Sequence, residues 1–300
     1  MANVIDLGRL RALDAIARYG TVLAAGVALR CTPSAVSQQL SKLERETGAT
    51  LVEKDGRRLR LTDAGRLLAD HATRVLAAVD EAESALAAHR DTVAGRLTIA
   101  SFATACRALL PYALRRLAEE HPALSTGLVE CDPHDALDRL VRGHVDVAVL
   151  DDWPEVSLRI PAGVEHRTLG LDTADLLVPA HHPLAGARSV SRERIRDERW
   201  ISALPGAICH EWLLRVLPGI RPDLIVGEFE TQITLVAAGL GVAMVPRLAR
   251  PALPDGVVAV PVRPTPTRQV GVAWRTTAST RPATAAAVAA LQDAWARLGR

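Results

Sequence analysis

The stretch that decides the fold is LRCTPSAVSQQLSKLERETG, residues 29–48. Within it, Thr32 can cap a helix, and Pro33 follows at the first helical position, where a missing N–H costs nothing. Gly48 can end the helix, because glycine takes up the left-handed conformation of helix ends at little cost. The stretch therefore predicts a helix running from about Pro33 to Thr47.

This helix has an apolar side and a polar side. Val36, Leu40 and Leu43 recur at the three- and four-residue spacing of a buried helical face. The other side carries hydroxyl, amide and cationic groups: Ser34, Ser37, Gln38, Ser41, Lys42 and Arg45. These groups can hydrogen-bond DNA, although a solvated helix surface would have the same composition.

Two helices are expected before this one. Apolar residues recur at helical spacing from Asp6 to Tyr19, and Gly20 ends the pattern. Thr21 can cap a short second helix, and a turn at Arg30 and Cys31 separates it from the third. The order of two helices joined by a tight turn is typical of a helix-turn-helix.

A basic wing is predicted directly after the third helix. Leu51–Val52 and Leu59–Leu61 suit short strands, and residues 54–58 give a basic turn between them. Residues 1–65 hold ten Lys and Arg against seven Asp and Glu, whereas the remainder holds 26 against 27. The surplus of positive charge thus lies where a DNA-binding domain is expected.

Helix-turn-helix proteins place the second helix of the pair in the major groove, with its N-terminal residues on base edges. Gln38 can make a bidentate contact to adenine, whereas Lys42 and the wing arginines suit phosphates. The predicted DNA-binding residues are Pro33, Ser34, Ser37, Gln38, Ser41, Lys42, Arg57 and Arg58.

After Thr62, which can cap a helix, the sequence predicts a long helix with a heptad seam. The seam consists of Leu68, Ala72, Val75, Val79, Ala82, Leu86 and His89. So regular a seam indicates pairing with a second copy of the chain. Packing of this helix on its own domain is the alternative.

From Gly95 onward, runs of Val, Ile and Leu alternate with helical stretches, which predicts a parallel α/β sheet. The expected strands are Leu97–Ala100, Leu124–Glu130, Val145–Leu150, Ala174–Pro179, Leu224–Phe229, Val242–Val245, Val257–Val262 and Val270–Trp274. The expected helices are Ala105–Ala118, Pro133–Val141, Thr231–Ala238 and Thr284–Leu298.

The stretch 29–48, Leu51, the basic turn and LTDAG at residues 61–65 together resemble the N-terminal signature of LysR-type transcriptional regulators. LTIAS at 97–101, HPLA at 182–185 and AGLGV at 238–242 extend the resemblance. Residues 52–54, VEK, lack the phenylalanine and arginine common in the family at this place, so the wing departs from the family pattern where the helix follows it.

The resemblance implies an α/β fold with an N-terminal winged helix-turn-helix, a long linker helix and a two-lobed effector domain like that of periplasmic binding proteins. The corresponding segments are 1–62, 63–92 and 93–300, with lobe I at 93–165 plus 268–300 and lobe II at 166–267. It also implies that Pro33, Ser34, Ser37 and Gln38 match positions that touch bases, and that Arg57 and Arg58 match the wing.

A cleft between two lobes would bind a ligand near the ends of strands and the starts of helices. Two strand-to-helix segments fit, and Ser202 joins them by family resemblance. The candidate effector-binding residues are Ser101, Phe102, Thr104, Ser202, Phe229 and Thr231. Ser101 and Thr231 could instead only cap their helices. Glu230, if it points inward, would disfavour an acidic ligand, which leaves a basic or zwitterionic effector open.

Metal, cofactor and catalytic sites are not expected. The four cysteines lack the spacing of a zinc site, and Cys106 or Cys209 has no second cysteine nearby in sequence for a redox pair. His181, His182 and the pair His210–Glu211 read as solvated loop residues. Motifs of hydrolases, nucleotide-binding enzymes and zinc proteases are missing from the sequence, so we expect no enzyme.

Nothing at the N-terminus resembles a signal peptide, and the longest apolar stretch, 235–246, is too short to span a bilayer. Aromatic residues make up only 3%, which disfavours RNA or single-stranded DNA as partner. We therefore expect a cytoplasmic regulator, a homodimer or homotetramer, that binds double-stranded DNA and responds to a small-molecule effector. If the regulator activates transcription, RNA polymerase is a further expected partner. A binding protein of periplasmic-receptor type without a DNA role is the alternative, against which the first 62 residues argue.

Overall fold

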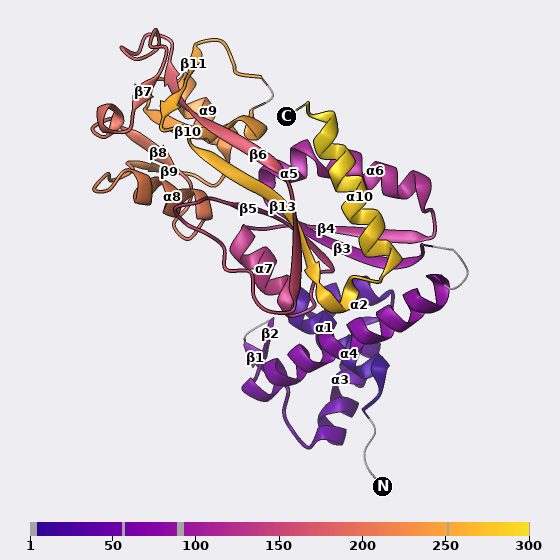
Figure 1. The fold of residues 1–300 in the computed structure, drawn as a ribbon. Coiled ribbons are helices and arrows are strands. Elements are labelled where there is room, and N and C mark those ends of the chain that lie inside the picture. The colour runs from indigo at the N-terminus through magenta and orange to yellow at the C-terminus, as the bar shows by residue number, and fades with distance from the viewer. Residues whose placement is uncertain (1–4, 56–57, 89–92, 251, 300) are drawn as a thin grey trace. The chain divides into compact units, whose positions relative to one another are not determined.

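The computed structural model describes residues 5–55, 58–88, 93–250 and 252–299, which form two compact units (Figure 1). The N-terminal unit extends to residue 86, and the C-terminal unit begins at residue 87. Among the described residues, no helix is long and apolar enough to cross a membrane.

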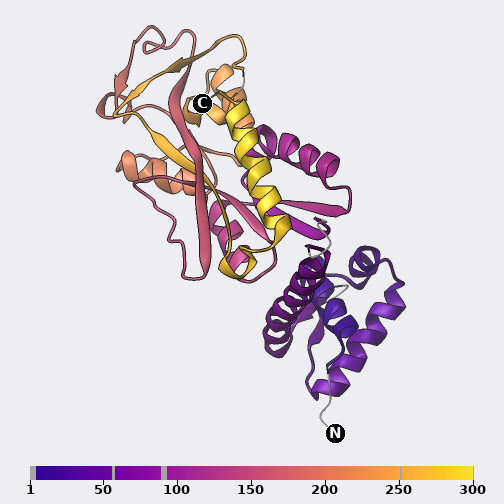
Figure 2. The same cartoon turned by 45° about the vertical axis from the view of Figure 1, so that its right-hand side comes forward.

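The N-terminal unit is a helix-turn-helix with a two-stranded wing and a long final helix (Figure 2). Its elements are α1 (Leu7–Tyr19), α2 (Val22–Leu29), α3 (Pro33–Thr47), β1 (Val52–Asp55), β2 (Arg58–Leu61) and α4 (Asp63–Ala88). The predicted bounds of α3 are confirmed, because the Thr32 hydroxyl accepts from the Ala35 N–H at 3.2 Å and Gly48 ends the helix at φ 66°.

Helices α1 and α3 contribute to two buried apolar clusters, one shared with α4 and one shared with α2. Leu40 and Leu43 of α3 are buried in the first and Val36 in the second, as their spacing predicts. Thr62 accepts from the Gly65 N–H at 3.0 Å and so begins α4. A Cβ at Gly65 would lie 1.9 Å from the Leu51 carbonyl oxygen, so only glycine permits this approach of α4 to the wing.

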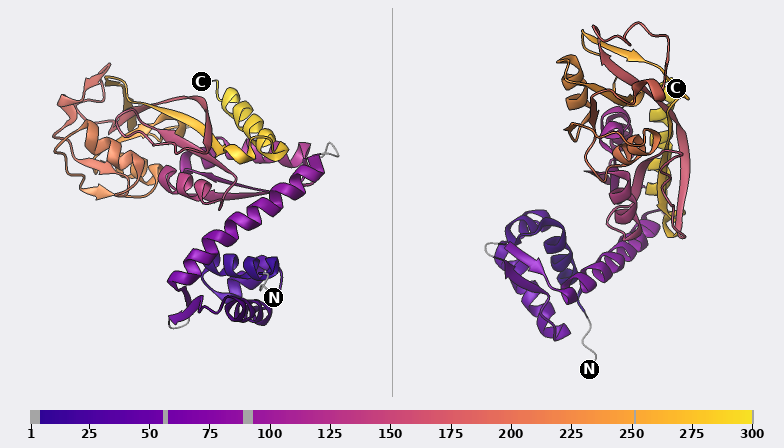
Figure 3. Two further views of the ribbon diagram at one scale, coloured as in Figure 1. Left: turned by 60° about the horizontal axis from the view of Figure 1, so that its bottom comes forward. Right: turned by 90° about the vertical axis from the view of Figure 1, so that its left-hand side faces the viewer.

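Helix α4 is seen along its length in Figure 3, and its predicted seam residues differ in their surroundings. Ala72 is fully buried in the core of its own unit and Leu68 packs against that core, as the alternative prediction holds. Val75 is 43% exposed, and Leu67 beside the seam is 64% exposed. The seam residue His89 lies outside the described residues.

The C-terminal unit is built on one twisted, nine-stranded sheet with the order β4-β3-β5-β13-β6-β10-β8-β9, and β11 also pairs with β6. Its strands are β3 (Gly95–Ser101), β4 (Leu124–Glu130), β5 (Val147–Asp152), β6 (Val164–Pro179), β8 (Trp200–Ser202), β9 (Leu224–Ile225), β10 (Val242–Pro246), β11 (Val257–Val260) and β13 (Thr267–Arg275). A separate short pair consists of β7 (Val190–Ser191) and β12 (Val262–Arg263).

Helices cover both faces of each half of the sheet, which gives two lobes, as predicted (Figures 1 and 2). The helices are α5 (Ala103–Ala108), α6 (Leu110–Glu120), α7 (Pro133–Val141), α8 (Ile208–Val216), α9 (Phe229–Ala237) and α10 (Pro282–Arg297). In lobe I, α6 and α10 pack on one face and α7 on the other. In lobe II, α8 and α9 pack on opposite faces.

The long strand β6 connects the two lobes. Its first part, residues 164–173, pairs with β13, and its last part, residues 174–179, pairs with β10 and β11. All of these pairings are antiparallel, as is that of β13 with β5. The prediction of a parallel sheet is therefore wrong for the centre of the sheet, and only β4-β3-β5 and β10-β8-β9 are parallel.

Three further predictions differ from the structure. The helix expected over Ala105–Ala118 is two helices, because the chain bends at Leu109 just before Pro111. The strand expected over Leu224–Phe229 ends at Ile225, and Phe229 already begins α9. Helix α8 was not expected at all.

Candidate functional sites

The polar side of α3 is an exposed surface. Ser34, Ser37 and Gln38 lie on it together with Pro33, Ser41 and Lys42. Arg57 lies outside the described residues, and only the backbone of Arg58 is described. The structure thus brings six of the eight predicted DNA-binding residues onto one helix.

Contacts on the opposite side fix the direction of this helix. A carboxylate oxygen of Glu44 accepts from the backbone N–H of Leu51 at 2.8 Å and of Val52 at 3.3 Å, which ties α3 to the start of the wing. An ion pair between Arg9 and Glu46 ties it to α1. The polar side is therefore presented by a helix held at three places: its cap, its core face and the wing.

The C-terminal unit contains a cavity of about 260 Å³ bordered by both lobes. Lobe I contributes the residues that follow β3, β4 and β5, and lobe II contributes the segments before α8 and α9. Phe102 and Thr104 border it from the first predicted segment, and Phe229 from the second.

The other three effector candidates do not line this cavity. Ser101 is completely buried as the last residue of β3, where its carbonyl accepts from the Cys131 N–H. Thr231 is exposed on α9, because the helix begins two residues earlier than the pattern suggests. Ser202 lines a smaller neighbouring cavity.

Arg268 and Asp151 border the cavity and form, with Asp172 behind them, a buried cluster of three charges. Arg268 donates to Asp151 at 3.0 Å and to Asp172 at 3.0 and 3.1 Å, and each of these side chains is at most 1% exposed. Burial raises the pKa of Asp151, while the neighbouring guanidinium opposes that shift. The Arg268 guanidinium also lies over the Phe102 ring, 5.1 Å from its centre.

Asp132 joins the two lobes through backbone hydrogen bonds. One of its carboxylate oxygens accepts from the His134 N–H at 3.1 Å, in the first turn of α7. The other accepts from the Ile208 N–H at 3.2 Å, at the start of α8. Burial raises the pKa of Asp132, and these two bonds oppose the shift. One carboxylate thus caps a helix in each lobe.

A second contact between the lobes lies at the rim. Arg107 of α5 pairs with Glu228 at 3.1 Å and with Glu230 at 2.7 Å. Glu228 lines the cavity, whereas Glu230 does not. The carboxylate that faces the cavity is therefore that of Glu228, and not that of Glu230, which the sequence analysis considered.

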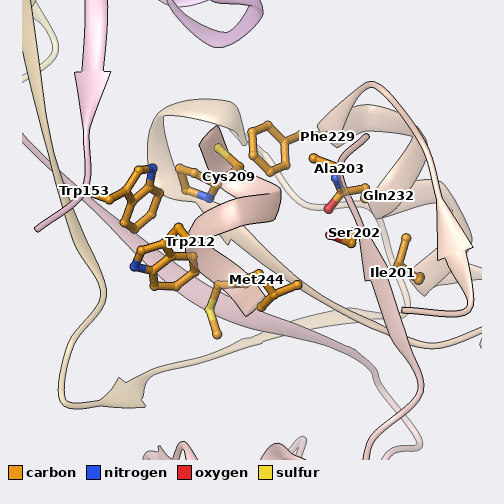
Figure 4. A pocket seen from close by; sticks show the side chains of 11 residues that line it. Trp153, Ile201, Ser202, Ala203, Cys209, Trp212, Phe229, Gln232 and Met244 are labelled. Carbon is orange, nitrogen blue, oxygen red and sulfur yellow. The ribbon is translucent and has the colours of Figure 1, made fainter. Parts of the chain in front are cut away.

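The smaller cavity, of about 10 Å³, has room for about one water molecule. It shares Ala203, Cys209 and Phe229 with the larger cavity. Figure 4 shows the indoles of Trp153 and Trp212 on one side of it, stacked with ring centres 4.2 Å apart, and Gln232 beside Ser202 on the other.

The prediction of solvated loop residues is confirmed for His181, which is exposed in a turn, and wrong for His210; His182 lies in a loop but is half-buried. His210 is buried on α8, and its Nδ1 is 2.9 Å from the Ser202 hydroxyl. The Nε2 of His182 is 3.2 Å from a carboxylate oxygen of Glu198. The described residues contain no group of three or more His, Cys, Asp or Glu that could hold a metal.

All four cysteines are free thiols. Burial raises the pKa of the Cys106 thiol, that of Cys131 to about 11 and that of Cys209 to about 12. Cys31 is exposed in the turn between α2 and α3. The thiols of the C-terminal unit are therefore protonated at neutral pH.

The charged residues of the cavity were missed at the sequence level. They are Glu130, Asp132, Asp151, Glu228 and Arg268. A signal existed for two of them, because Glu130 and Asp151 are the last or next-to-last residues of strands that end at the cleft. Arg268 gave no signal, since it lies inside β13 and is placed by aspartates far away in the sequence.

Two family models match the chain. The helix-turn-helix model of the bacterial regulatory lysR family matches residues 7–66, and the LysR substrate binding domain matches residues 90–296. The chain is 30% identical over 274 residues to a probable hydrogen peroxide-inducible genes activator of Mycobacterium avium, covering 89% of this chain and 86% of the relative. It is 28% identical over 280 residues to the DNA-binding transcriptional dual regulator OxyR of Escherichia coli, covering 90% of each.

The fold is also that of a solved relative. Full-length OxyR of Pseudomonas aeruginosa, in a single-residue variant, superimposes with a TM-score of 0.75 at 24% identity, covering 97% of each chain. Both units of the chain therefore have counterparts in the Mycobacterium avium activator and in OxyR of Escherichia coli.

Proposed function

This chain belongs to the LysR family of bacterial transcriptional regulators, and we propose that the first turns of α3 read base edges while the interlobe cavity receives the effector. It is a DNA-binding regulator with an effector-binding C-terminal domain. Its relatives are regulators rather than enzymes.

The exposed amide of Gln38 is the observation that carries the DNA-reading proposal. It lies on the second turn of α3, between the hydroxyls of Ser34 and Ser41, on the side of the helix that faces away from the core. An amide can both donate to and accept from adenine, which phosphate-binding cations such as Lys42 cannot do. Gln38 is therefore assigned to base recognition and Lys42 to phosphate binding.

A gel-shift experiment with the DNA upstream of the chain's own gene tests this assignment. Gln38→Ala should lower affinity by about 1–3 kcal/mol for operators with the correct base at its position and little for operators mutated there. Lys42→Ala should weaken all sequences alike and reduce the salt dependence. Equal losses on every sequence for both variants would refute the division of roles.

The effector proposal rests on the position of the cavity at the junction of the lobes. Segments of both lobes border it, and Asp132 and Arg107 connect the lobes directly at its edge. A ligand in this place contacts both lobes and can therefore favour one arrangement of them over another, which is what an effector requires.

We do not propose that this chain senses peroxide, although a relative is an activator of hydrogen peroxide-inducible genes. Oxidation by peroxide begins with a thiolate, and burial raises the pKa of each cysteine of the C-terminal unit. Exposure to hydrogen peroxide followed by mass spectrometry should find no disulfide among Cys106, Cys131 and Cys209. A peroxide-induced disulfide there would favour redox control instead.

The exposed apolar side chains Leu67 and Val75 on α4 support pairing of this helix with a second copy, as a homodimer or homotetramer. Light scattering on the full chain and on Val75→Glu tests this, because a charge in the seam should lower the oligomeric state. Because the DNA of a bacterium lies in its cytoplasm, we propose that the protein acts there. If the protein activates transcription, RNA polymerase is a further partner.

A further inference from the structure

The charges around the interlobe cavity are unbalanced. Four carboxylates line it, those of Glu130, Asp132, Asp151 and Glu228, against one guanidinium, that of Arg268. Arg268 already pairs with two buried aspartates, of which only Asp151 borders the cavity. Glu228 pairs with Arg107, which lies outside the lining, so two guanidinium groups in all stand against the four lining carboxylates. A ligand inside therefore meets an excess of negative charge.

Carboxylates of the chain itself stand at the places where this fold would hold an anion. Helix N-termini bind carboxylates and phosphates through their free N–H groups. Here Asp132 accepts from the N–H groups at the starts of α7 and α8, so the chain supplies its own carboxylate to both. Glu228 stands at the cap position of α9 and lines the cavity, and its side chain makes no cap hydrogen bond. An anionic ligand would thus meet a carboxylate beside each of these three helix starts.

Thr104 is a second observation, independent of the charge. The residue is 2% exposed and lines the cavity, and no hydrogen bond of its hydroxyl is found among the described residues. The hydroxyl oxygen is not one of the fully buried unpaired atoms of the described residues, so it can be reached from the cavity. A polar group in so enclosed a place usually has a hydrogen-bond partner. A ligand N–H group in the cavity would satisfy this oxygen, because a hydroxyl accepts as readily as it donates.

The carboxylates are too dispersed for a metal ion, since no group of three metal-binding side chains gathers among the described residues. Between them lie the apolar walls of Phe102, Leu204 and Phe229. An extended ligand with a carbon chain and N–H groups suits such a lining, and a cation can also lie over an aromatic ring.

We propose that the interlobe cavity binds an organic cation, a protonated amine or guanidinium on a short carbon chain, with Glu130 and Asp151 as its ionic partners and Thr104 as its neutral acceptor. This rests on the proposed effector role of the cavity and names the class of effector. A cation bound beside Asp151 competes with Arg268 for that carboxylate, and so acts on the strands β6 and β13 that connect the lobes.

Isothermal titration calorimetry on the full chain tests the ligand class. The probes are cadaverine and agmatine as cations, glutarate as an anion of similar length, and pentanediol as a neutral analogue. We expect the cations to bind, with affinity that falls as salt rises, and glutarate and pentanediol not to bind. Binding of glutarate in their place, or binding of neither cation, would overturn the proposal.

Three variants locate the bound cation. Glu130→Gln should weaken cation binding about tenfold or more, and Thr104→Val about fivefold. Glu119→Gln is the matched control, since Glu119 is exposed on α6 away from the cavity, and it should leave affinity unchanged. Equal affinities in all three would place the cation elsewhere on the surface and refute the assignment.

Operator binding in the same preparations separates this proposal from the function it rests on. If the chain forms a specific DNA complex but binds neither cation, the proposed regulatory function stands and only the proposed class of ligand is refuted. If the cations bind at the cavity but do not change the DNA complex, the proposed cation site stands and its proposed role as an effector site is refuted.

Discussion

The polar side of α3 and the interlobe cavity are both candidate binding sites, yet they are built in opposite ways. The first is one continuous stretch, residues 33–42, whose direction is set by a cap and three buried apolar side chains. The second draws its charged residues from the ends of three strands and two loops, and it borders a buried cluster of three charges. The first site therefore depends on local contacts, and the second on pairs distant in sequence.

Thiol reactivity should give the largest contrast between the two regions. Burial raises the pKa of the Cys209 thiol, which borders the cavity, to about 12. At pH 8 its thiolate is then about 10³ times rarer than that of free cysteine, and its alkylation is slowed accordingly. Limited treatment with iodoacetamide should label the exposed Cys31 and spare Cys209, as peptide mass spectrometry can show.

The rate at Cys209 should keep rising with pH up to its pKa, in the chain and in the control variant Cys31→Ser alike. Similar labelling of Cys31 and Cys209 at pH 8 would mean that the cavity is wet and open, and it would remove the contrast.

Removal of Arg268 should have the largest effect on stability. Arg268→Met leaves the carboxylates of Asp151 and Asp172 buried without their cation, which costs about 3–5 kcal/mol. Urea unfolding followed by tryptophan fluorescence measures this loss, because all five tryptophans lie in the C-terminal unit. Arg115→Met, which removes an exposed pair with Glu119 and a contact over the Tyr112 ring, should cost less than about 1 kcal/mol.

The deficit of Arg268→Met should shrink as the pH falls. Burial raises the pKa of Asp151, and the loss of the guanidinium removes the group that opposes the shift. A carboxyl group with a pKa higher in the folded than in the unfolded state binds protons more readily when folded, so acid favours the folded state of the variant. A deficit independent of pH would show that lost packing, and not unpaired charge, is the cause.

The same difference in construction explains what could be predicted from the sequence. The bounds of α3 could be predicted because Thr32, Pro33 and Gly48 carry the signals within the helix itself. Helix α8 could not, because Ala207 at its start has no capping side chain and the cap comes from Asp132, 76 positions earlier. The order of lobes followed from the family resemblance, whereas the antiparallel centre of the sheet has no local signature.

The cavity residues follow the same rule. Phe102, Thr104 and Phe229 could be proposed because each lies at a strand-to-helix junction visible in the sequence. Arg268 could not, since a lone arginine in a strand reads as an exposed residue until Asp151 and Asp172 are placed beside it. What escapes prediction is the pairing of buried charges across the fold, which depends on tertiary structure alone.

Loss of the Asp132 carboxylate should have an intermediate effect. Asp132→Ala removes two hydrogen bonds that cap α7 and α8, which together are worth about 2 kcal/mol. The same tryptophan fluorescence measures the loss. Asp135→Ala is the control on the first turn of α7, where it removes only a favourable charge worth about 0.5 kcal/mol. Equal losses in the two variants would deny Asp132 its role in joining the lobes.

The smallest effect is expected at the cap of α3. Thr32→Ala removes the hydroxyl that accepts from the Ala35 N–H, at a cost of about 1 kcal/mol confined to the N-terminal unit. Hydrogen exchange at the first turns of α3 should speed up about fivefold, while tryptophan fluorescence of the C-terminal unit stays unchanged. Thr47→Ala is the matched control, because its hydroxyl donates to the Leu43 carbonyl at the other end of the same helix. If Thr47→Ala loosens the first turns as much, the direction of the polar side is set by the whole core and not by its cap.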